Sequence, residues 1–257
     1  MPASAADAPC PEQAFNATAL KWHTCAWLLL PVLIFLAGWM HWYAALPLML
    51  LTAAGLAPRK RKEPQTRDSL PAFPLFTRSS FLALAAFAAL MTLSGWGEWV
   101  NQHPDHIVRN ACLRELVASP WPVIFPDGNM LVYNTGFWLV PALAGKLAGL
   151  DAARVFVVLW GTWGLFLTWL WLCVFSGRRS LLLALLMAAF GSLLNFQCWL
   201  GLDLFRLHYF GTAEQIMCSA NASIPVLLFF IFLASGRMPL PWIPLLFAAT
   251  AFYLSLI

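Results

Sequence analysis

The chain has 257 residues, of which 61% are hydrophobic and 10% charged, and its formal net charge is +4. A mean hydropathy of +0.74, with 14 tryptophans and 20 phenylalanines, excludes an ordinary soluble domain and is typical of membrane-spanning helices. We therefore expect an all-α fold, a polytopic transmembrane helix bundle of about seven spans embedded in a lipid bilayer.

The N-terminal quarter is predicted to form a tail, a hairpin and a loop. Residues 1–23 lack the positive n-region of a secretory signal and are expected to form a cytoplasmic tail. The apolar run at 24–57 is too long for one untilted span, and His41 between aromatic and apolar neighbours favours a transmembrane hairpin. The segment 58–79 carries four consecutive basic residues at 59–62, which predicts a cytoplasmic loop and no nucleic-acid partner.

The region 80–257 is expected to hold the remaining spans and two outer loops, at 98–153 and 201–222. Its spans are expected at about 80–97, 154–175, 180–200, 223–235 and 241–257. The segment 131–150 is interrupted by polar residues and a proline, so we expect it to be a juxtamembrane helix. With the basic loop inside, the chain is predicted to be a multi-pass protein of a bacterial inner (plasma) membrane with a cytoplasmic N-terminus.

A polar island between residues 95 and 128 holds most of the candidate chemistry. Pro104 and Asp105 suit the first turn of a helix, because proline needs no N–H partner there and the carboxylate faces the positive end of the helix dipole. Over 105–118 we expect an apolar stripe of Ile107, Val108, Ala111, Cys112 and Leu116. The opposite stripe is predicted to face a cavity and contains Asp105, His106, Arg109 and Asn110.

Spacing within this island indicates an ion pair. Asp105 and Arg109 are four residues apart, so they can meet on one helix face. An ordinary solvated face explains the same spacing, but the position directly after a span that ends in Glu98 favours a functional site. The second outer loop contains Arg206 and His208, a cation and a donor suited to a phosphate, with solvent-exposed loop residues as the alternative reading.

Other motifs exclude several classes of protein. Asp127 lies in a Pro-Asp-Gly sequence and is more simply a turn former than a catalyst. Six cysteines show no zinc-ligand spacing, although a disulfide between Cys112 and Cys218 is possible in an oxidising compartment. No P-loop, dinucleotide-binding glycine fingerprint, serine nucleophile elbow or HExxH motif is present.

With these residues in view, the chain resembles the GT-C superfamily of membrane glycosyltransferases, in which a span leads into an outer loop with an early acidic motif and juxtamembrane helices. The matching features are Glu98, Asp105-His106 and the runs WPVIFPDGNMLVYNTGFWLVPALAGKLAG and FGSLLNFQCWLGLDLFRLHYF. Members of this family usually carry more spans, and the chain stops at Ile257 inside an apolar run, which is consistent with a fragment of a longer protein.

The resemblance implies transfer of a sugar from a polyprenyl-phosphate donor to an acceptor hydroxyl at the outer face. It implies Asp105 as the general base, Glu98 as a second carboxylate or metal ligand, and His106 as a residue that orients Asp105 or shares the phosphate. Arg109 and Arg206 would neutralise the leaving phosphate. The paired acidic residues common in this family are absent, which leaves the metal unknown and a divalent cation an open question.

A non-enzymatic role is the alternative hypothesis. The same composition fits a membrane transporter or a component that assembles envelope lipids or polysaccharides. Convergence of Glu98, Asp105, Arg109 and Arg206 would favour the enzyme, whereas scattered side chains would favour the alternative.

Overall fold

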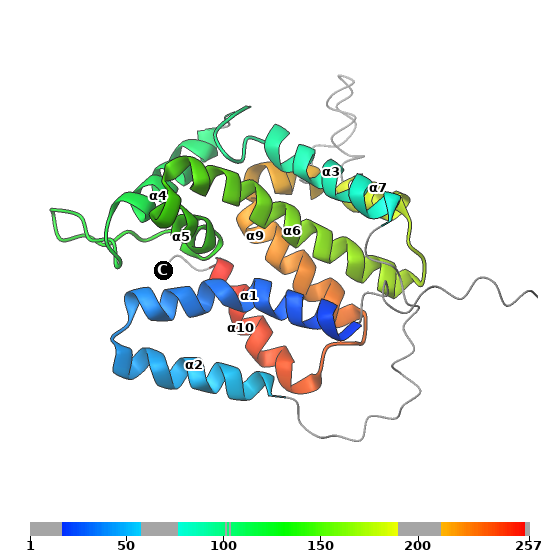
Figure 1. The fold of residues 1–257 in the computed structure, drawn as a ribbon, viewed down its shortest axis with the longest axis horizontal. Coiled ribbons are helices and arrows are strands. Elements are labelled where there is room, and N and C mark those ends of the chain that lie inside the picture. The colour runs from blue at the N-terminus through cyan, green and yellow to red at the C-terminus, as the bar shows by residue number, and fades with distance from the viewer. Residues whose placement is uncertain (1–16, 58–76, 101, 103, 190–211, 255–257) are drawn as a thin grey trace, which may run out of the picture.

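A computed structural model describes residues 17–57, 77–100, 102, 104–189 and 212–254. Within these ranges the chain is all-helical and forms nine α-helices and two 3-10 helices. The described part has no strand beyond an isolated bridge between Ile124 and Met130. Figure 1 shows the helices gathered into one bundle, with α6 through its middle.

Two helices occupy the segment 24–57, which was predicted to be a hairpin, and the first of them already begins inside the predicted tail 1–23. Helix α1 (Ala17–Trp39) ends two residues before His41, and α2 (Trp42–Leu56) starts one residue after it. His41 has an extended backbone, with φ −62° and ψ 143°, which separates the two helical segments. The helices lie side by side in the lower part of Figure 1.

The next helix is shorter than the apolar run that predicted it. Helix α3 (Arg78–Leu93) begins after Thr77, whose hydroxyl accepts a hydrogen bond from the Ser80 N–H at 3.3 Å, as an N-cap should. It stops before Gly95 and Gly97, which both have positive φ. The span expected to run to residue 97 therefore ends at Leu93.

Helix α6 (Leu150–Ser176) is the centre of the bundle and packs against α3, α5 (Leu139–Ala148) and α9 (Thr212–Ala234). Gly164 allows close approach, since a Cβ there would lie 2.6 Å from Ile224 and 2.7 Å from Trp27. Trp171 stacks on Phe232, with ring centroids 4.4 Å apart. These two contacts, advancing together along both helices, show that α6 and α9 run parallel.

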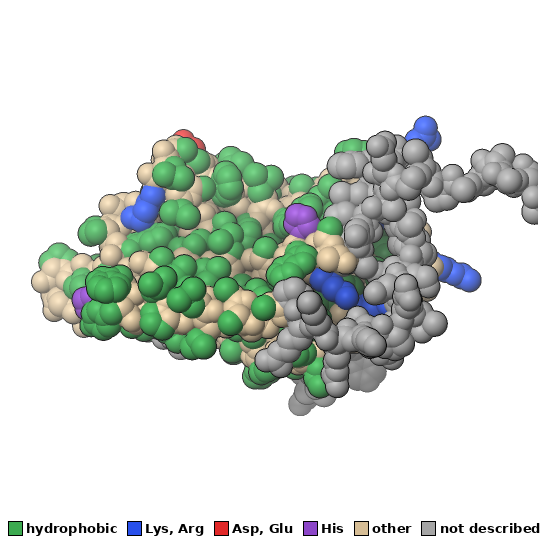
Figure 2. All heavy atoms as spheres, turned by 60° about the horizontal axis from the view of Figure 1, so that its bottom comes forward, with side chains coloured by type: hydrophobic (Ala, Val, Ile, Leu, Met, Phe, Trp, Pro, Cys, Tyr) green, Lys and Arg blue, Asp and Glu red, His purple; other side chains and the backbone are tan. Residues whose placement is uncertain are grey.

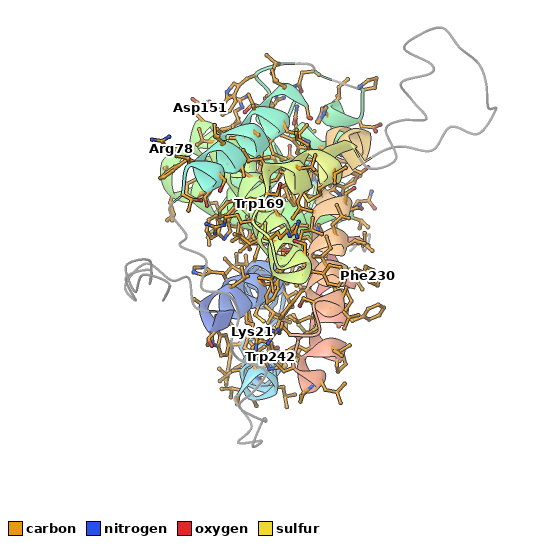
Figure 3. The ribbon with its side chains drawn as sticks, turned by 90° about the vertical axis from the view of Figure 1, so that its right-hand side faces the viewer. Lys21, Arg78, Asp151, Trp169, Phe230 and Trp242 are labelled. Atoms are coloured by element: carbon orange, nitrogen blue, oxygen red, sulfur yellow. The ribbon has the colours of Figure 1, made fainter. Side chains whose placement is uncertain are left out.

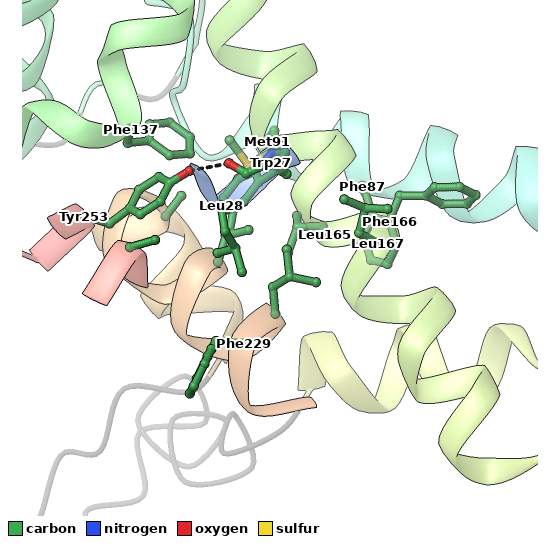
Figure 4. Close-up of a cluster of buried hydrophobic side chains, with 14 of the residues drawn as sticks. Trp27, Leu28, Phe87, Met91, Phe137, Leu165, Phe166, Leu167, Phe229 and Tyr253 are labelled. Atoms are coloured by element: carbon green, nitrogen blue, oxygen red, sulfur yellow. Dashed lines mark hydrogen bonds between the residues drawn. The ribbon is translucent and has the colours of Figure 1, made fainter. Parts of the chain in front are cut away.

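An aromatic stack joins the first and last helices to α6. The Trp27 ring lies between Trp160 and Tyr253, with centroids 5.0 and 5.3 Å away. The Tyr253 hydroxyl donates to the Trp27 carbonyl at 2.6 Å, the dashed contact in Figure 4. Tyr253 belongs to α10 (Ile243–Leu254), which follows the 3-10 helix η4 (Leu240–Trp242). This stack fixes α10 against the bundle.

Two of the described helices, Thr18–Trp39 and Leu150–Ser176, are long and apolar enough to cross a membrane. The shorter apolar helices have 10–17 residues and are Trp42–Leu56, Arg78–Leu93, Ser219–Ala234 and Leu240–Leu254. A bundle of seven spans is therefore not confirmed. The glycines after Leu93 end α3 before the predicted residue 97, whereas α9 begins before the predicted residue 223 and has a kink at Ser219. Helix α7 (Leu181–Ala189) covers the first part of the span expected at 180–200, and residues 190–200 lie outside the described ranges.

The sides of the bundle expose many large apolar side chains. Leu51 of α2 is 67% exposed, Phe81 of α3 59% and Leu185 of α7 65%. In Figure 2 hydrophobic side chains dominate the face that is turned to the viewer. A soluble monomer rarely exposes so much contiguous apolar surface.

Candidate functional site

Helix α4 (Pro104–Ala118) begins at the predicted proline, but its faces differ from the predicted stripes. Its buried residues are His106, Arg109, Cys112, Leu113 and Leu116. Ile107 and Val108 are 69% and 54% exposed. The prediction put Cys112 and Leu116 on one face with Ile107 and Val108, and this is wrong. Cys112 and Leu116 instead lie on the buried face together with His106 and Arg109. Packing against α5 and α6 selects this face over the one that hydrophobicity favours.

His106 attaches α4 to the end of α3. Its ring is fully buried, and Nε2 lies 2.9 Å from the Ser94 carbonyl oxygen. The ring also meets Trp96 edge-on, with centroids 5.2 Å apart and planes at 89°. These contacts make His106 a residue that positions the first turn of α4.

Arg109 is buried beside the predicted carboxylate. Its Nη2 lies 3.8 Å from Asp105 Oδ2, and its guanidinium carbon lies 5.6 Å from the centre of the Trp96 ring. Arg109 is only 6% exposed, whereas the Asp105 side chain is 52% exposed. The Nε and Nη1 donors of Arg109 are buried and have no hydrogen-bond partner in the part of the chain that the structure describes. Buried donors of this kind are costly unless a ligand or water accepts from them.

Glu98 is the centre of a second cluster. Its Oε2 accepts hydrogen bonds from Arg114 at 2.6 Å and from Arg154 at 2.5 Å, and Arg154 also reaches Asp151 at 2.7 Å. Burial raises the pKa of the Glu98 carboxyl, but hydrogen bonds and charge from Arg114 and Arg154 outweigh burial and hold the pKa below its ordinary value. Its other oxygen, Oε1, is buried without a hydrogen-bond partner.

The loop between α3 and α4 holds these side chains in place. Glu98 has φ 67°, a left-handed conformation that few non-glycine residues adopt. The Gln102 amide donates to the Gly95 and Val100 carbonyls at 2.9 and 3.0 Å, and it accepts from Asn110 of α4 at 2.7 Å. Gln102 thus ties the turn to the helix.

The segment 131–150 forms two short helices, η3 (Thr135–Trp138) and α5, and each of these helices is too short to span a membrane. Its Lys146 reaches back to the C-terminal end of α4, where Nζ donates to the Ser119 carbonyl at 2.6 Å. The ammonium lies 4.9 Å from the centre of the Trp121 ring, and burial lowers the pKa of Lys146. Lys146 therefore compensates the end of the α4 dipole.

Two expectations on the polar island have clear outcomes. Asp127 is a turn residue, because its carboxylate accepts a hydrogen bond from the Asn129 N–H at 3.1 Å at the tip of a small hairpin.

Cys112 is a free, buried thiol, which contradicts the predicted disulfide with Cys218. Burial raises the pKa of Cys112 to about 12, so the thiol stays protonated and unreactive.

The predicted site residues divide into two neighbouring groups. Asp105 and Arg109 form the predicted pair, with His106 on the same inward face. Glu98 lies with Arg114 and Arg154, which the sequence did not single out because they are 16 and 56 residues away from it. Trp96 contacts Arg109 and is two residues from Glu98, so one loop serves both groups. Arg206 and His208 lie outside the described residues.

A divalent cation does not fit the arrangement that is described. In residues 17–57, 77–100, 102, 104–189 and 212–254, no three His, Cys, Asp or Glu side chains converge as metal ligands. The best-placed carboxylate oxygen, Glu98 Oε2, is already shared by two guanidinium groups.

Comparison with known proteins gave no match to a protein-family model, to a curated protein or to a solved structure. The site therefore has to be interpreted from its own geometry.

Proposed function

We propose that the chain is a multi-pass membrane protein of the GT-C type, which transfers a sugar from a polyprenyl-phosphate donor to an acceptor hydroxyl at the outer face. The observation that carries this proposal is the Arg109 guanidinium, which is buried beside Asp105 and has two nitrogens, Nε and Nη1, without a hydrogen-bond partner among the described residues. A phosphate oxygen is the acceptor that such donors suit best.

The membrane placement is supported by where the charges lie. The described acidic side chains are all near the α3–α4 loop, α4 or the start of α6, and they are Glu98, Asp105, Glu115, Asp127 and Asp151. The opposite end of the bundle carries only basic residues within the described chain. Because an excess of Lys and Arg marks the cytoplasmic side, the site would face outward in a bacterial inner membrane.

In the proposed reaction the acceptor oxygen attacks C1 of the sugar, and the bond from C1 to the phosphate oxygen breaks. Asp105 takes the acceptor proton, a role that its half-exposed carboxylate allows. Arg109 compensates the charge of the departing lipid phosphate. Glu98 holds Arg114 and Arg154 at the edge of the site, and His106 keeps α4 in register with Ser94.

Release of polyprenyl phosphate from a panel of lipid-linked sugars, with the protein in vesicles, tests this function. We expect Asp105→Asn to lower the release rate by about a hundredfold or more, as loss of a general base does. Asp127→Asn is the matched control, because Asn suits the same exposed turn and lies outside the site. Unchanged release with Asp105→Asn would remove Asp105 as the base, and no release from any lipid-linked sugar would remove the transferase.

One observation favours the alternative of a non-enzymatic transporter or envelope-assembly component. Helix α9 breaks at Ser219, and the side-chain oxygens of Asn221 and Thr162 are buried without hydrogen-bond partners. Broken helices with spare polar groups line the transport sites of membrane carriers. If this role holds, Asn221→Ala stops movement of a fluorescent polyprenyl lipid across vesicles, whereas Asp105→Asn does not.

A further inference from the structure

One end of the bundle is basic, opposite the candidate site. The basic residues there lie in the first turns of helices or in the turns that follow them, and they are Lys21, Arg78, Arg178, Arg179 and Arg237; we call this set the basic end. Figure 3 looks onto it, with Lys21 and Arg78 labelled. No acidic side chain of the described ranges lies among them.

Contacts between distant segments hold these residues at the same end. Arg179 donates to the Thr77 hydroxyl at 3.1 Å, which brings the start of α3 to the turn after α6. The Arg179 guanidinium also lies 5.8 Å from the centre of the Trp169 ring. At the other side of this end, Trp22 packs on Trp242 with centroids 5.2 Å apart.

The surroundings of the basic end combine positive charge with apolar and aromatic surface. Arg78 and Arg178 are exposed, and so are Trp22 at 42% and Phe175 at 63%. Tryptophan near basic residues is typical of the headgroup level of a bilayer.

We propose that the basic end binds the headgroups of acidic phospholipids in the leaflet that it faces. The phosphates of an anionic leaflet supply negative charge over an area, which matches five basic residues spread over four chain segments. The inference rests on the membrane placement given under Proposed function, but it needs no transferase activity.

The test uses the full chain in phosphatidylcholine vesicles with trace spin-labelled phosphatidylglycerol or phosphatidylcholine. The motionally restricted fraction of each spectrum gives the association of that lipid with the protein. We expect phosphatidylglycerol to associate about fivefold more strongly, because one basic residue at an anionic headgroup contributes about that factor. The Arg78→Gln/Arg178→Gln double variant should bring the two lipids close to parity, whereas Arg78→Lys/Arg178→Lys should keep the preference.

The outcomes separate this inference from the function on which it rests. Equal association of both lipids with the unchanged protein, or a preference that survives the Gln double variant, overturns the headgroup site. A spectrum without any restricted lipid overturns the membrane placement itself. Loss of the preference in millimolar inorganic phosphate at constant ionic strength would mean a site for free phosphate and would also overturn the proposal.

Discussion

Glu98 is the residue on which the geometry of the site depends most. Its carboxylate is shared by two guanidinium groups, and its backbone has φ 67°, which a glutamate rarely adopts. The two ion pairs therefore hold Glu98 in a conformation that it does not favour by itself. Since Arg114 belongs to α4 and Arg154 to α6, this single side chain joins the loop to two helices. Its loss should loosen the loop that also carries Trp96 beneath Arg109.

We expect Glu98→Gln to lower the free energy of unfolding by about 2 kcal/mol, because a neutral amide removes the counter-charge of Arg114 and leaves Arg154 with Asp151 alone. Unfolding in detergent micelles, followed by circular dichroism, measures the change. Glu115→Gln is the matched control, since Glu115 only accepts a 3.3 Å hydrogen bond from Ser119 and should change stability by less than about 0.5 kcal/mol. Equal effects of both variants would contradict a special role for Glu98.

The lowered pKa of Glu98 also predicts a pH dependence. Its folded-state pKa lies below the unfolded value of about 4.3, so its contribution to stability is complete above that pH and is lost as the pH falls through the folded pKa. We expect the melting temperature of the unchanged protein to fall between pH 6 and pH 3 more steeply than that of Glu98→Gln. Parallel curves for the two proteins would show that Glu98 does not carry this dependence.

At the scale of helices, the sequence predicted the start of α4 and one of its ion pairs correctly, but it did not predict which face of α4 is buried. Pro104 predicted the start of the helix, and the spacing of Asp105 and Arg109 predicted their pair. Arg109 was not expected to share a buried face with Leu113, because burial of a guanidinium depends on Trp96, which comes from another segment.

The same limit applies to the rest of the fold. The break at His41 has a local signal, an isolated polar residue between aromatics, and it was predicted. The end of α3 depends on backbone geometry at Gly95, so composition predicted a helix that ran too far. The kink of α9 at Ser219 has no signal in composition, and the predicted span started later than this helix does. Arg154 has no spacing relation to Glu98, and the packing of α3 and α4 on α6 brings the α3–α4 loop to Arg154.

Gly145 is where α5 meets both helices of the site. A Cβ there would lie 2.5 Å from Val117 of α4 and 2.8 Å from the Cβ of Ala153 on α6, which cannot rotate away. We expect Gly145→Ala to destabilise the protein by about 1–3 kcal/mol, the usual cost of overpacking. Leu147→Ala on the same helix is the control, because Leu147 is 83% exposed. Thermal unfolding of both variants in micelles decides whether α5 packs as described.

At the scale of the molecule, apolar sides separate a purely basic end from an end where acidic and basic residues mix. Several leucines of the short helices α2 and α7 lie on these apolar sides, and their side chains are more than half exposed. In water such a surface would drive aggregation, whereas hydrocarbon covers it at no cost. In the proposed membrane placement, the charge difference between the ends would set the orientation.

Cysteine accessibility tests this orientation directly. In a background with the six native cysteines replaced by alanine, Leu147→Cys lies near the site and Arg178→Cys at the basic end. We expect a membrane-impermeant maleimide to label Leu147→Cys on intact cells and Arg178→Cys only after permeabilisation, because the basic end should face the cytoplasm. The reverse pattern would place the site inside and remove an outer-face reaction. Labelling of both positions on intact cells would mean that the bundle does not separate two compartments, and the exposed leucines would then have to pack against another protein.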